Sequence, residues 1–119
     1  MQHPSGPSVP ELPTRALHSL AARWAAKEAF IKAWSSLYYG REDPLKSADI
    51  DWAQIEVVCD RRGRPAFRFH GQIASELDKT QEELKASLSW LLSLSHDGNY
   101  AIAWVSVNQT DLREAKEFS

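Results

Sequence analysis

One stretch of the chain decides the fold, and it reads Arg23-Trp24-Ala25-Ala26-Lys27-Glu28-Ala29-Phe30-Ile31-Lys32-Ala33-Trp34. In and around it, residues recur every three or four positions, the spacing that places side chains on one face of an α-helix. The members of this stripe are Leu17, Leu20, Trp24, Ile31, Ser35 and Tyr38. We therefore predict a helix over about residues 14–39, with Thr14 as its N-cap and Gly40 as its C-terminal stop.

Glu28 is the unusual member of this helix. At about 100° per residue it falls between Ala21 and Trp24, inside the stripe that should face the core. A carboxylate there costs several kcal/mol, in order of magnitude, unless a cation or strong donors meet it. A metal ion bound by Glu28, with Lys27 and Lys32 binding phosphate oxygens beside it, would satisfy this arrangement. An ordinary ion pair between Glu28 and Lys32, worth about 0.2 to 0.5 kcal/mol, is the alternative that geometry leaves open.

The rest of the chain alternates short strands with one further helix. Two positions are typical of tight turns. Gly63 supplies a positive φ within residues 61–64, and Asp97-Gly98 is a strong hairpin signal. The class predicted is α+β, with antiparallel β hairpins packed against a long helix. The expected elements are strands at residues 54–60 and 66–70, a helix at 72–84, and strands at 88–95 and 100–107.

Composition sets limits on the class of protein. The 119 residues, 43% of them hydrophobic, predict one domain, here residues 14–108, between a proline-rich flexible leader at 1–13 and a polar tail at 109–119. The net charge of -2 gives no argument for binding nucleic acid or a membrane. A single cysteine, Cys59, allows no internal disulfide and fits a reducing compartment, and we expect it in the core. No apolar run is long enough to span a bilayer, which makes the cytoplasm the expected location.

Residues 22–33 closely resemble the central motif of the holo-acyl-carrier-protein synthases, the small phosphopantetheinyl transferases of fatty-acid synthesis. The tryptophan-rich sequence of this motif is similar to the versions from actinobacteria. Two further segments agree in order and spacing, so the resemblance spans residues 17–107. They are Ile55-Glu56-Val57 followed by Asp60 and Gly63-Arg64-Pro65, and Leu94-Ser95-His96-Asp97-Gly98 followed by Tyr100-Ala101-Ile102-Ala103.

The resemblance implies a phosphopantetheinyl transferase-like fold and a magnesium-dependent transfer of 4′-phosphopantetheine from coenzyme A to a serine of an acyl carrier protein. It implies that Glu28 is the metal ligand and that Glu28 and Lys32 are the catalytic residues. It also implies a homotrimer with the coenzyme in a cleft between subunits. The residues implied to bind coenzyme A are Arg23, Lys27, Lys32, Gly63, Arg64, Pro65, Ser95 and His96.

Each of these residues also has a simpler interpretation. Arg23 could lie over Trp24 without any ligand, and a histidine such as His96 at a strand end is usually a turn residue. Gly63-Arg64-Pro65 is explained by turn chemistry alone. The five tryptophans fall mostly at expected core positions, and no Cys/His cluster has zinc spacing.

One part of the family pattern is absent. Enzymes of this family open with a short apolar strand whose Gly-x-Asp motif supplies a second metal ligand, whereas this chain opens Met1-Gln2-His3-Pro4. A fragment, a start placed too late and a degenerate copy are all consistent with this, and we expect reduced turnover. An inactive relative that only binds coenzyme A or a partner, and a non-enzymatic α+β interaction domain, remain as alternatives. Coenzyme A titration and turnover on apo-carrier protein separate them.

Overall fold

The computed structural model describes residues 14–97 and 100–112. Its regular elements confirm the α+β class and follow the predicted order, two helices and two β hairpins within the described ranges. They are α1 (Thr14–Ser36), β1 (Ile55–Cys59), β2 (Pro65–Phe69), α2 (Gly71–Leu84), β3 (Ala86–Asp97) and β4 (Tyr100–Asp111), with two short 3-10 turns at Ser47–Asp49 and Trp52–Gln54.

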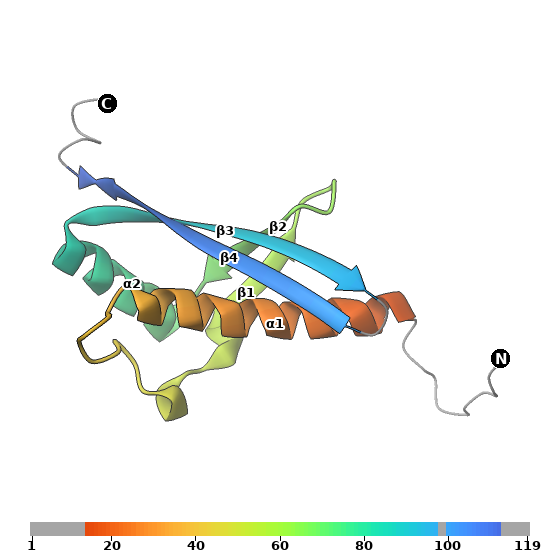
Figure 1. The fold of residues 1–119 in the computed structure, drawn as a ribbon, viewed down its shortest axis with the longest axis horizontal. Coiled ribbons are helices and arrows are strands. Elements are labelled where there is room, and N and C mark those ends of the chain that lie inside the picture. The colour runs from red at the N-terminus through yellow and green to blue at the C-terminus, as the bar shows by residue number, and fades with distance from the viewer. Residues whose placement is uncertain (1–13, 98–99, 113–119) are drawn as a thin grey trace.

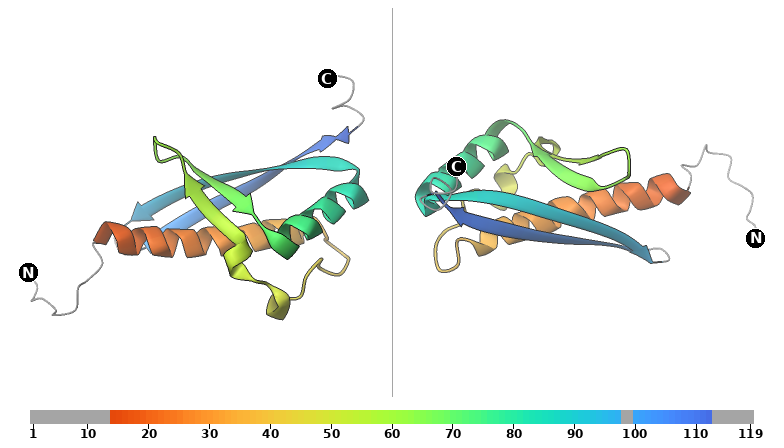
Figure 2. Two further views of the ribbon diagram at one scale, coloured as in Figure 1. Left: turned by 180° about the vertical axis from the view of Figure 1, so that it is seen from behind. Right: turned by 90° about the horizontal axis from the view of Figure 1, so that it is seen from above.

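The long helix α1 is the axis of the fold (Figure 1). The β3–β4 hairpin runs lengthwise beside α1, and the β1–β2 hairpin lies on another side of it, with β2 next to β3 (Figure 2). Each hairpin is an antiparallel pair, and the register of the longer one places Trp90 opposite Val107 and Asp97 opposite Tyr100. α2 packs against β3 at the end of the molecule where α1 finishes.

The core forms where α1 meets both hairpins. Ile55 and Val57 are buried on alternate positions of β1, as their period of two predicts. Ile73 and Leu77 bury one side of α2. Phe30 of α1 sits at the centre, completely buried. The buried cluster comprises Phe30, Trp34, Tyr38, Ile55, Ile73 and Leu77.

One expectation about the core is wrong, that for Cys59, and the one for the tryptophans holds for most of them, since Trp52 and Trp90 also pack against the core. Cys59 is exposed, because it ends β1 opposite Pro65, two positions past Val57, the last buried residue of that strand. Not all tryptophans pack inside: Trp34 is buried, but Trp24 is 49% exposed and Trp104 is 74% exposed. Trp104 lies opposite Ser93 on the outer side of the β3–β4 hairpin, where nothing in the described part of the chain covers it.

The ends of several elements differ from the predicted ones. α1 stops at Ser36 and is followed by a turn that ends at Gly40, whose φ of +81° confirms its role as the stop. β4 extends to Asp111, so the hairpin continues into the stretch predicted as a tail. The predicted leader at residues 1–13, Gly98 of the predicted turn and residues 113–119 lie outside the described ranges. Among the described helices, none is long and apolar enough to cross a membrane.

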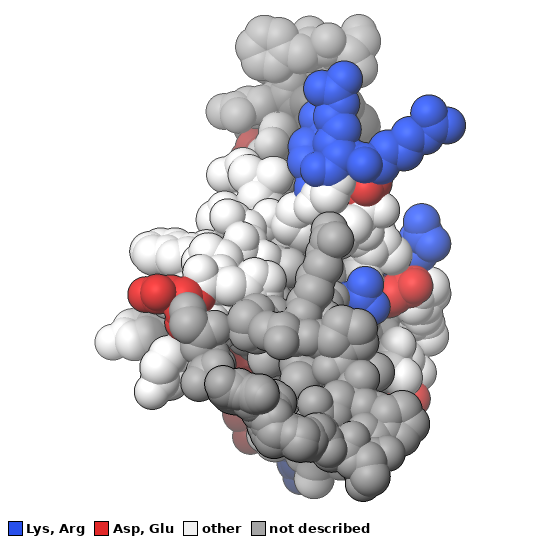
Figure 3. Space-filling view, turned by 90° about the vertical axis from the view of Figure 1, so that its right-hand side faces the viewer, with Lys and Arg blue, Asp and Glu red and all other residues white. Residues whose placement is uncertain are grey.

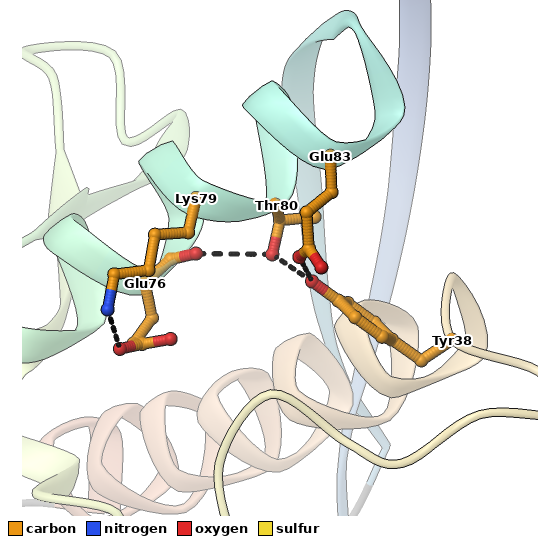
Figure 4. Close-up of polar contacts among 5 residues, drawn as sticks. All are labelled: Tyr38, Glu76, Lys79, Thr80 and Glu83. Atoms are coloured by element: carbon orange, nitrogen blue, oxygen red, sulfur yellow. Dashed lines mark hydrogen bonds and ion pairs between the residues drawn. The ribbon is translucent and has the colours of Figure 1, made fainter.

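A buried polar network ties α1 to α2 (Figure 4). Thr80 is the only buried polar residue found in the described ranges, and its Oγ1 donates to the carbonyl of Glu76 at 3.1 Å. The same oxygen accepts a hydrogen bond from Trp34 Nε1 at 3.0 Å and lies 2.7 Å from the hydroxyl of Tyr38. Tyr38 also bonds Glu83 at 2.7 Å. The end of α1 is thereby fixed against α2 by satisfied, directional contacts.

This network predicts a loss of stability at high pH. Burial raises the pKa of Tyr38 above its ordinary value of 10.0, and the Glu83 carboxylate adds to the rise. Stability from a group with a raised pKa is fully present below the ordinary value and is lost as the pH rises through the folded-state pKa. The free energy of unfolding should therefore fall above pH 10.0. In Tyr38→Phe that fall should shrink, and at neutral pH the variant should lose about 0.5 to 1.5 kcal/mol. Urea unfolding across pH 7 to 11 measures both; an identical pH profile in the variant would contradict the assignment.

Gly71, at the first turn of α2, is required by both its backbone and its surroundings. Its φ is +54°, and an added Cβ would lie 2.5 Å from Nε2 of Gln54. Gln54 Oε1 accepts a hydrogen bond from the backbone N–H of Ile73, one of the first donors of α2. Gly71→Ala should therefore lower the free energy of unfolding by about 2 to 3 kcal/mol, the sum of left-handed strain and the disturbed bond.

The matched control for Gly71 is Gly40→Ala. Its φ is also positive, at +81°, but an added Cβ would meet nothing within 4 Å. This variant should lose only the backbone term of about 1 to 2 kcal/mol. Equal losses in the two variants, measured by urea unfolding, would show that the contact with Gln54 is unimportant.

Candidate functional site

The face of α1 that carries the candidate residues points away from the core. The buried stripe consists of residues four apart: Ala22, Ala26, Phe30, Trp34 and Tyr38. Glu28 precedes Phe30 by two positions, about 200° around the helix, and it is exposed. The prediction of a core-facing Glu28 is therefore wrong. The predicted stripe holds only in its second half, because Tyr38 is buried but Leu20 is 55% exposed. The helix has apolar residues on more than one side, and the side with Phe30 forms the centre of the core.

Glu28 and Lys32 lie one turn apart on the exposed side of α1, and both side chains are exposed. Within residues 14–97 and 100–112 neither side chain takes part in a hydrogen bond or an ion pair, so the ordinary Glu28–Lys32 ion pair is not formed. A carboxylate and an ammonium are thus presented side by side to solvent. Such a pair suits a ligand that combines a divalent cation with phosphate oxygens.

Lys27 is partly engaged within the protein. Its Nζ donates a hydrogen bond to the carbonyl oxygen of Trp52 at 3.0 Å, close to where the Trp24 and Trp52 rings meet with centroids 5.1 Å apart. An ammonium has three N–H donors, so two remain for a ligand. The implied role for Lys27 in binding coenzyme A remains a prediction, with a structural role now established beside it.

Arg23 lies in the same shallow groove as Lys27, with Glu56 of β1 on the other wall. Oε1 of the Glu56 carboxylate accepts a hydrogen bond from His70 Nε2 at 2.8 Å. This bond, with the positive charges of Arg68 and Arg23 nearby, lowers the pKa of Glu56. Arg23 therefore lies in one groove with Lys27, Glu56 and Trp24, and its implied role in binding coenzyme A remains a prediction.

The turn between β1 and β2 is organised by Asp60. Its Oδ1 accepts from the backbone N–H groups of Arg62 and Arg64, and its Oδ2 pairs with Arg64 Nε. These hydrogen bonds lower the pKa of Asp60. Gly63 has a φ of +77° with open space around its Cβ position, so the turn itself requires glycine there. Pro65 begins β2.

Ser95 and His96 are exposed near the tip of the β3–β4 hairpin, opposite Ile102 and Ala101. That tip, the β1–β2 turn and the first half of α1 all lie at the same end of the molecule (Figures 1 and 2). Figure 3 looks at this end and shows Lys and Arg side chains gathered on one part of it, with acidic side chains beside some of them. The segments that carry Arg23, the 63–65 turn and Ser95–His96 are thus brought to one end, whereas Lys27 and Lys32 lie further along α1.

The structure does not gather all the candidates into one pocket. Arg23 and Lys27 share the groove beside Glu56, whereas Lys32 borders two other hollows, one along β4 and one at the end of α1. In the described part of the chain, no three His, Cys, Asp or Glu residues lie close enough together to hold a metal ion. The candidates on α1 instead fall on two sides of it: Arg23 and Lys27 face the groove beside β1, and Lys32 faces the hollow along β4, with Glu28 one turn before it. The hollow at the end of α1 was not predicted, because the loop of residues 40–50 that borders it has no sequence motif.

Comparison with known proteins identifies the family of this chain. The profile of the 4′-phosphopantetheinyl transferase superfamily matches residues 8–105. The chain belongs to this superfamily. It is 50% identical over 84 residues to a holo-[acyl-carrier-protein] synthase of Corynebacterium efficiens, covering 71% of this chain and 57% of that protein. It is 43% identical over 90 residues to the same-named protein of Corynebacterium glutamicum strain R, covering 76% and 64%.

A solved structure agrees. The superfamily fold of this chain superimposes on the "Chronobacterium ammoniagenes ACPS-CoA complex" with a TM-score of 0.70 and 43% identity, covering 78% of this chain and 65% of that one. The resemblance stated from the motifs and the fold that it implied are both confirmed. The chain spans between 57% and 65% of the length of these three proteins.

Proposed function

We propose that this chain transfers 4′-phosphopantetheine from coenzyme A to a serine hydroxyl of an acyl carrier protein, as a magnesium-dependent step of fatty-acid synthesis. The observation that carries the proposal is the exposed Glu28–Lys32 pair, unpaired within the described ranges, on the helix of a superfamily member. The similar proteins named holo-[acyl-carrier-protein] synthase support the substrate class. The single, exposed Cys59 agrees with a reducing, cytoplasmic setting.

In the proposed reaction the serine Oγ of the carrier attacks the phosphorus that bears the pantetheine arm. A new P–O bond forms, the P–O bond to the bridging oxygen of the diphosphate breaks, and adenosine 3′,5′-bisphosphate leaves with the electron pair. The serine proton passes to Glu28 or to water. Lys32 binds a diphosphate oxygen and stabilises the charge that develops on the leaving group.

Magnesium fits the donor set on α1. One exposed carboxylate, Glu28, with substrate phosphates is a usual environment for Mg²⁺, which is often bound through one or two carboxylates and keeps several waters. When bound, the ion neutralises diphosphate charge. At the end of the molecule that carries the β1–β2 turn and the tip of the β3–β4 hairpin, Arg23, Arg64 and His96 supply donors for the phosphates of the adenosine half, and we place Gly63, Pro65 and Ser95 along its path.

A homotrimer is part of the proposal. The outer side of the β3–β4 hairpin carries Leu91, Tyr100, Ile102 and Trp104, all exposed in the single chain. Apolar surface of this kind is typical of an interface between subunits. Light scattering distinguishes a trimer from a monomer, and a monomer at assay concentration would contradict this part of the proposal.

The test of the function is direct. The purified chain, Mg²⁺, coenzyme A and an apo-acyl carrier protein should give a carrier whose mass rises by one phosphopantetheine, with release of adenosine 3′,5′-bisphosphate. Binding of coenzyme A without any transfer would favour an inactive relative. Absence of binding would favour a non-enzymatic interaction domain.

Lys32→Ala should weaken binding of coenzyme A. The lost charge-assisted hydrogen bond is worth about 1 to 3 kcal/mol, which is roughly a 5-fold to 150-fold rise in Kd. Calorimetric titration in Mg²⁺ measures it, with Lys46→Ala, another exposed lysine, as the control that should bind normally. Normal binding by Lys32→Ala together with complete loss of turnover would assign Lys32 to proton transfer instead.

A further inference from the structure

The charges of this chain are separated along the molecule, although their sum is only -2. At the end where α1 finishes and α2 packs, one hollow is lined mainly by acidic side chains (Figure 1). The charged members of its lining are Glu42, Asp43, Glu76, Lys79, Glu82 and Glu83. The turn between β1 and β2 lies on the side where α1 begins, and it carries arginine at positions 61, 62 and 64. The chain is therefore acidic at one end and basic towards the other.

The basic end is organised by the β1–β2 turn, residues 60–65, which we call the arginine turn. Asp60 Oδ1 accepts hydrogen bonds from the backbone N–H groups of Arg62 and Arg64, at 2.8 Å and 2.9 Å. The Asp60 N–H donates to the Arg64 carbonyl at 3.1 Å, and the Gly63 N–H donates to the Asp60 carbonyl at 2.9 Å. These hydrogen bonds hold the turn in one conformation in the chain by itself, so a partner that binds it does not have to order it.

Two guanidinium groups of the arginine turn are unused. Arg61 and Arg62 are exposed, and in the described part of the chain neither guanidinium takes part in a hydrogen bond, an ion pair or a ring contact. Arg64 differs, because its Nε pairs with Asp60 Oδ2 at 2.5 Å. A guanidinium offers five N–H donors in a planar fork that matches a carboxylate or a phosphate. The turn thus presents two preformed anion-binding groups to solvent.

We propose that the arginine turn docks an acidic surface of the acyl carrier protein, with Arg61 and Arg62 bound to carboxylates of that surface. The inference rests on the proposed function, which makes the carrier the protein substrate of this chain. The acidic hollow beside α2 repels the same surface. The separation of charge therefore sets the orientation in which the carrier approaches.

The place of the turn suits a protein substrate. The turn lies at the same end of the molecule as the first half of α1 (Figures 1 and 2). A carrier bound there lies alongside the helix that presents Glu28 and Lys32. Figure 3 shows Lys and Arg side chains gathered on one part of this end, so the approaching surface meets positive charge.

The charges favour an acidic protein over a nucleic acid as the occupant. A nucleic acid is often held through about 6 to 10 phosphate contacts, whereas two guanidinium groups are free on the arginine turn. A long polyanion would also extend towards the acidic hollow beside α2. A folded protein can instead present a local group of carboxylates to the turn alone.

Charge reversal tests the proposal. At low salt, Arg61→Glu combined with Arg62→Glu should raise the KM for apo-acyl carrier protein about tenfold or more and leave the KM for coenzyme A within about twofold. The matched control is Lys46→Glu combined with Lys79→Glu, which changes the net charge equally at two exposed lysines away from the turn. The control should keep the KM for the carrier within about twofold of the unaltered chain.

Two further measurements separate docking from damage to the fold. Arg61→Lys combined with Arg62→Lys keeps both charges, so its KM for the carrier should lie within about threefold of the unaltered chain. At about 1 M salt, where the Debye length is about 3 Å, the charge-reversed variant and the unaltered chain should have KM values for the carrier within about twofold of each other. A difference that persisted at high salt would overturn electrostatic docking.

The remaining outcomes also decide the assignment. An unchanged KM for the carrier in the charge-reversed variant would show that the carrier docks elsewhere, and an equal loss of coenzyme A binding would assign Arg61 and Arg62 to the coenzyme. Tighter binding of a duplex oligonucleotide than of the carrier would make a nucleic acid the occupant. If the unaltered chain transferred no phosphopantetheine, the proposed function would fail. Titration of labelled carrier into the unaltered chain and the charge-reversed variant would still decide docking, and equal Kd values would refute it.

Discussion

Phe30→Ala is expected to lower the free energy of unfolding by about 3 to 5 kcal/mol, the usual cost of removing a large buried aromatic side chain. Phe30 is completely buried, and its ring meets those of Phe69 and Trp90 at centroid distances of 4.7 Å each. It meets Phe67 at 5.3 Å and Trp34 at 5.7 Å. One side chain therefore joins α1 to β2 and β3, and its loss leaves a cavity among rigid rings that cannot close.

Urea unfolding followed by tryptophan fluorescence measures this effect. Tyr39→Ala is the control, because Tyr39 follows the same helix and is 96% exposed. It should change stability by no more than about 0.5 kcal/mol. A loss below about 1.5 kcal/mol in Phe30→Ala would mean that the aromatic cluster rearranges to fill the space, and that Phe30 is not the centre of the core.

Glu28→Gln should reduce transfer of phosphopantetheine by about a hundredfold. The amide keeps the size of the side chain and removes the negative charge proposed to hold Mg²⁺, and misplacing a reacting group by about 1 Å costs roughly this factor. Because Glu28 is exposed and has no partner in the described ranges, its substitution should leave the free energy of unfolding within about 0.5 kcal/mol.

Initial rates at varied Mg²⁺ test this prediction, with Glu82→Gln on α2 as an exposed acidic control. The control should turn over normally. A Glu28→Gln enzyme with normal rate and normal Mg²⁺ dependence would remove Glu28 from the metal site. A variant that lost stability as well as activity would restore the structural interpretation of this acid.

The stability of the chain and its proposed activity depend on different sides of α1. Local signals were enough to predict the helix itself: Thr14 starts it, its residues favour helical structure, and Gly40 with a φ of +81° ends its final turn. They were not enough to choose its buried side. Trp24 and Ile31 make one apolar row, and Phe30 with Trp34 makes another, and a periodicity of three and four fits both.

For the candidate site too, the sequence predicted some features and missed others. The motif around Glu28 and Lys32 was sufficient to find the family, which the superfamily match confirms. The reason first given for singling out Glu28, burial among apolar residues, is wrong, because its carboxylate is exposed. The engagement of Lys27 by the Trp52 carbonyl joins residues 25 positions apart, and no local pattern signals such a bond.

By itself, the sequence determined the α+β class, the order of the elements, the alternation of Ile55 and Val57 on β1 and the family of the chain, because local periodicity, turn residues and a contiguous motif carry that information. Only the tertiary structure decided which side of α1 is buried, that Cys59 and Trp104 face outward, and that a cavity forms beside Lys32. These features depend on where the two hairpins and the loop of residues 40–50 pack. That packing is set by how the whole chain fills space around Phe30, since burial belongs to surfaces that meet in three dimensions and not to neighbours along the chain.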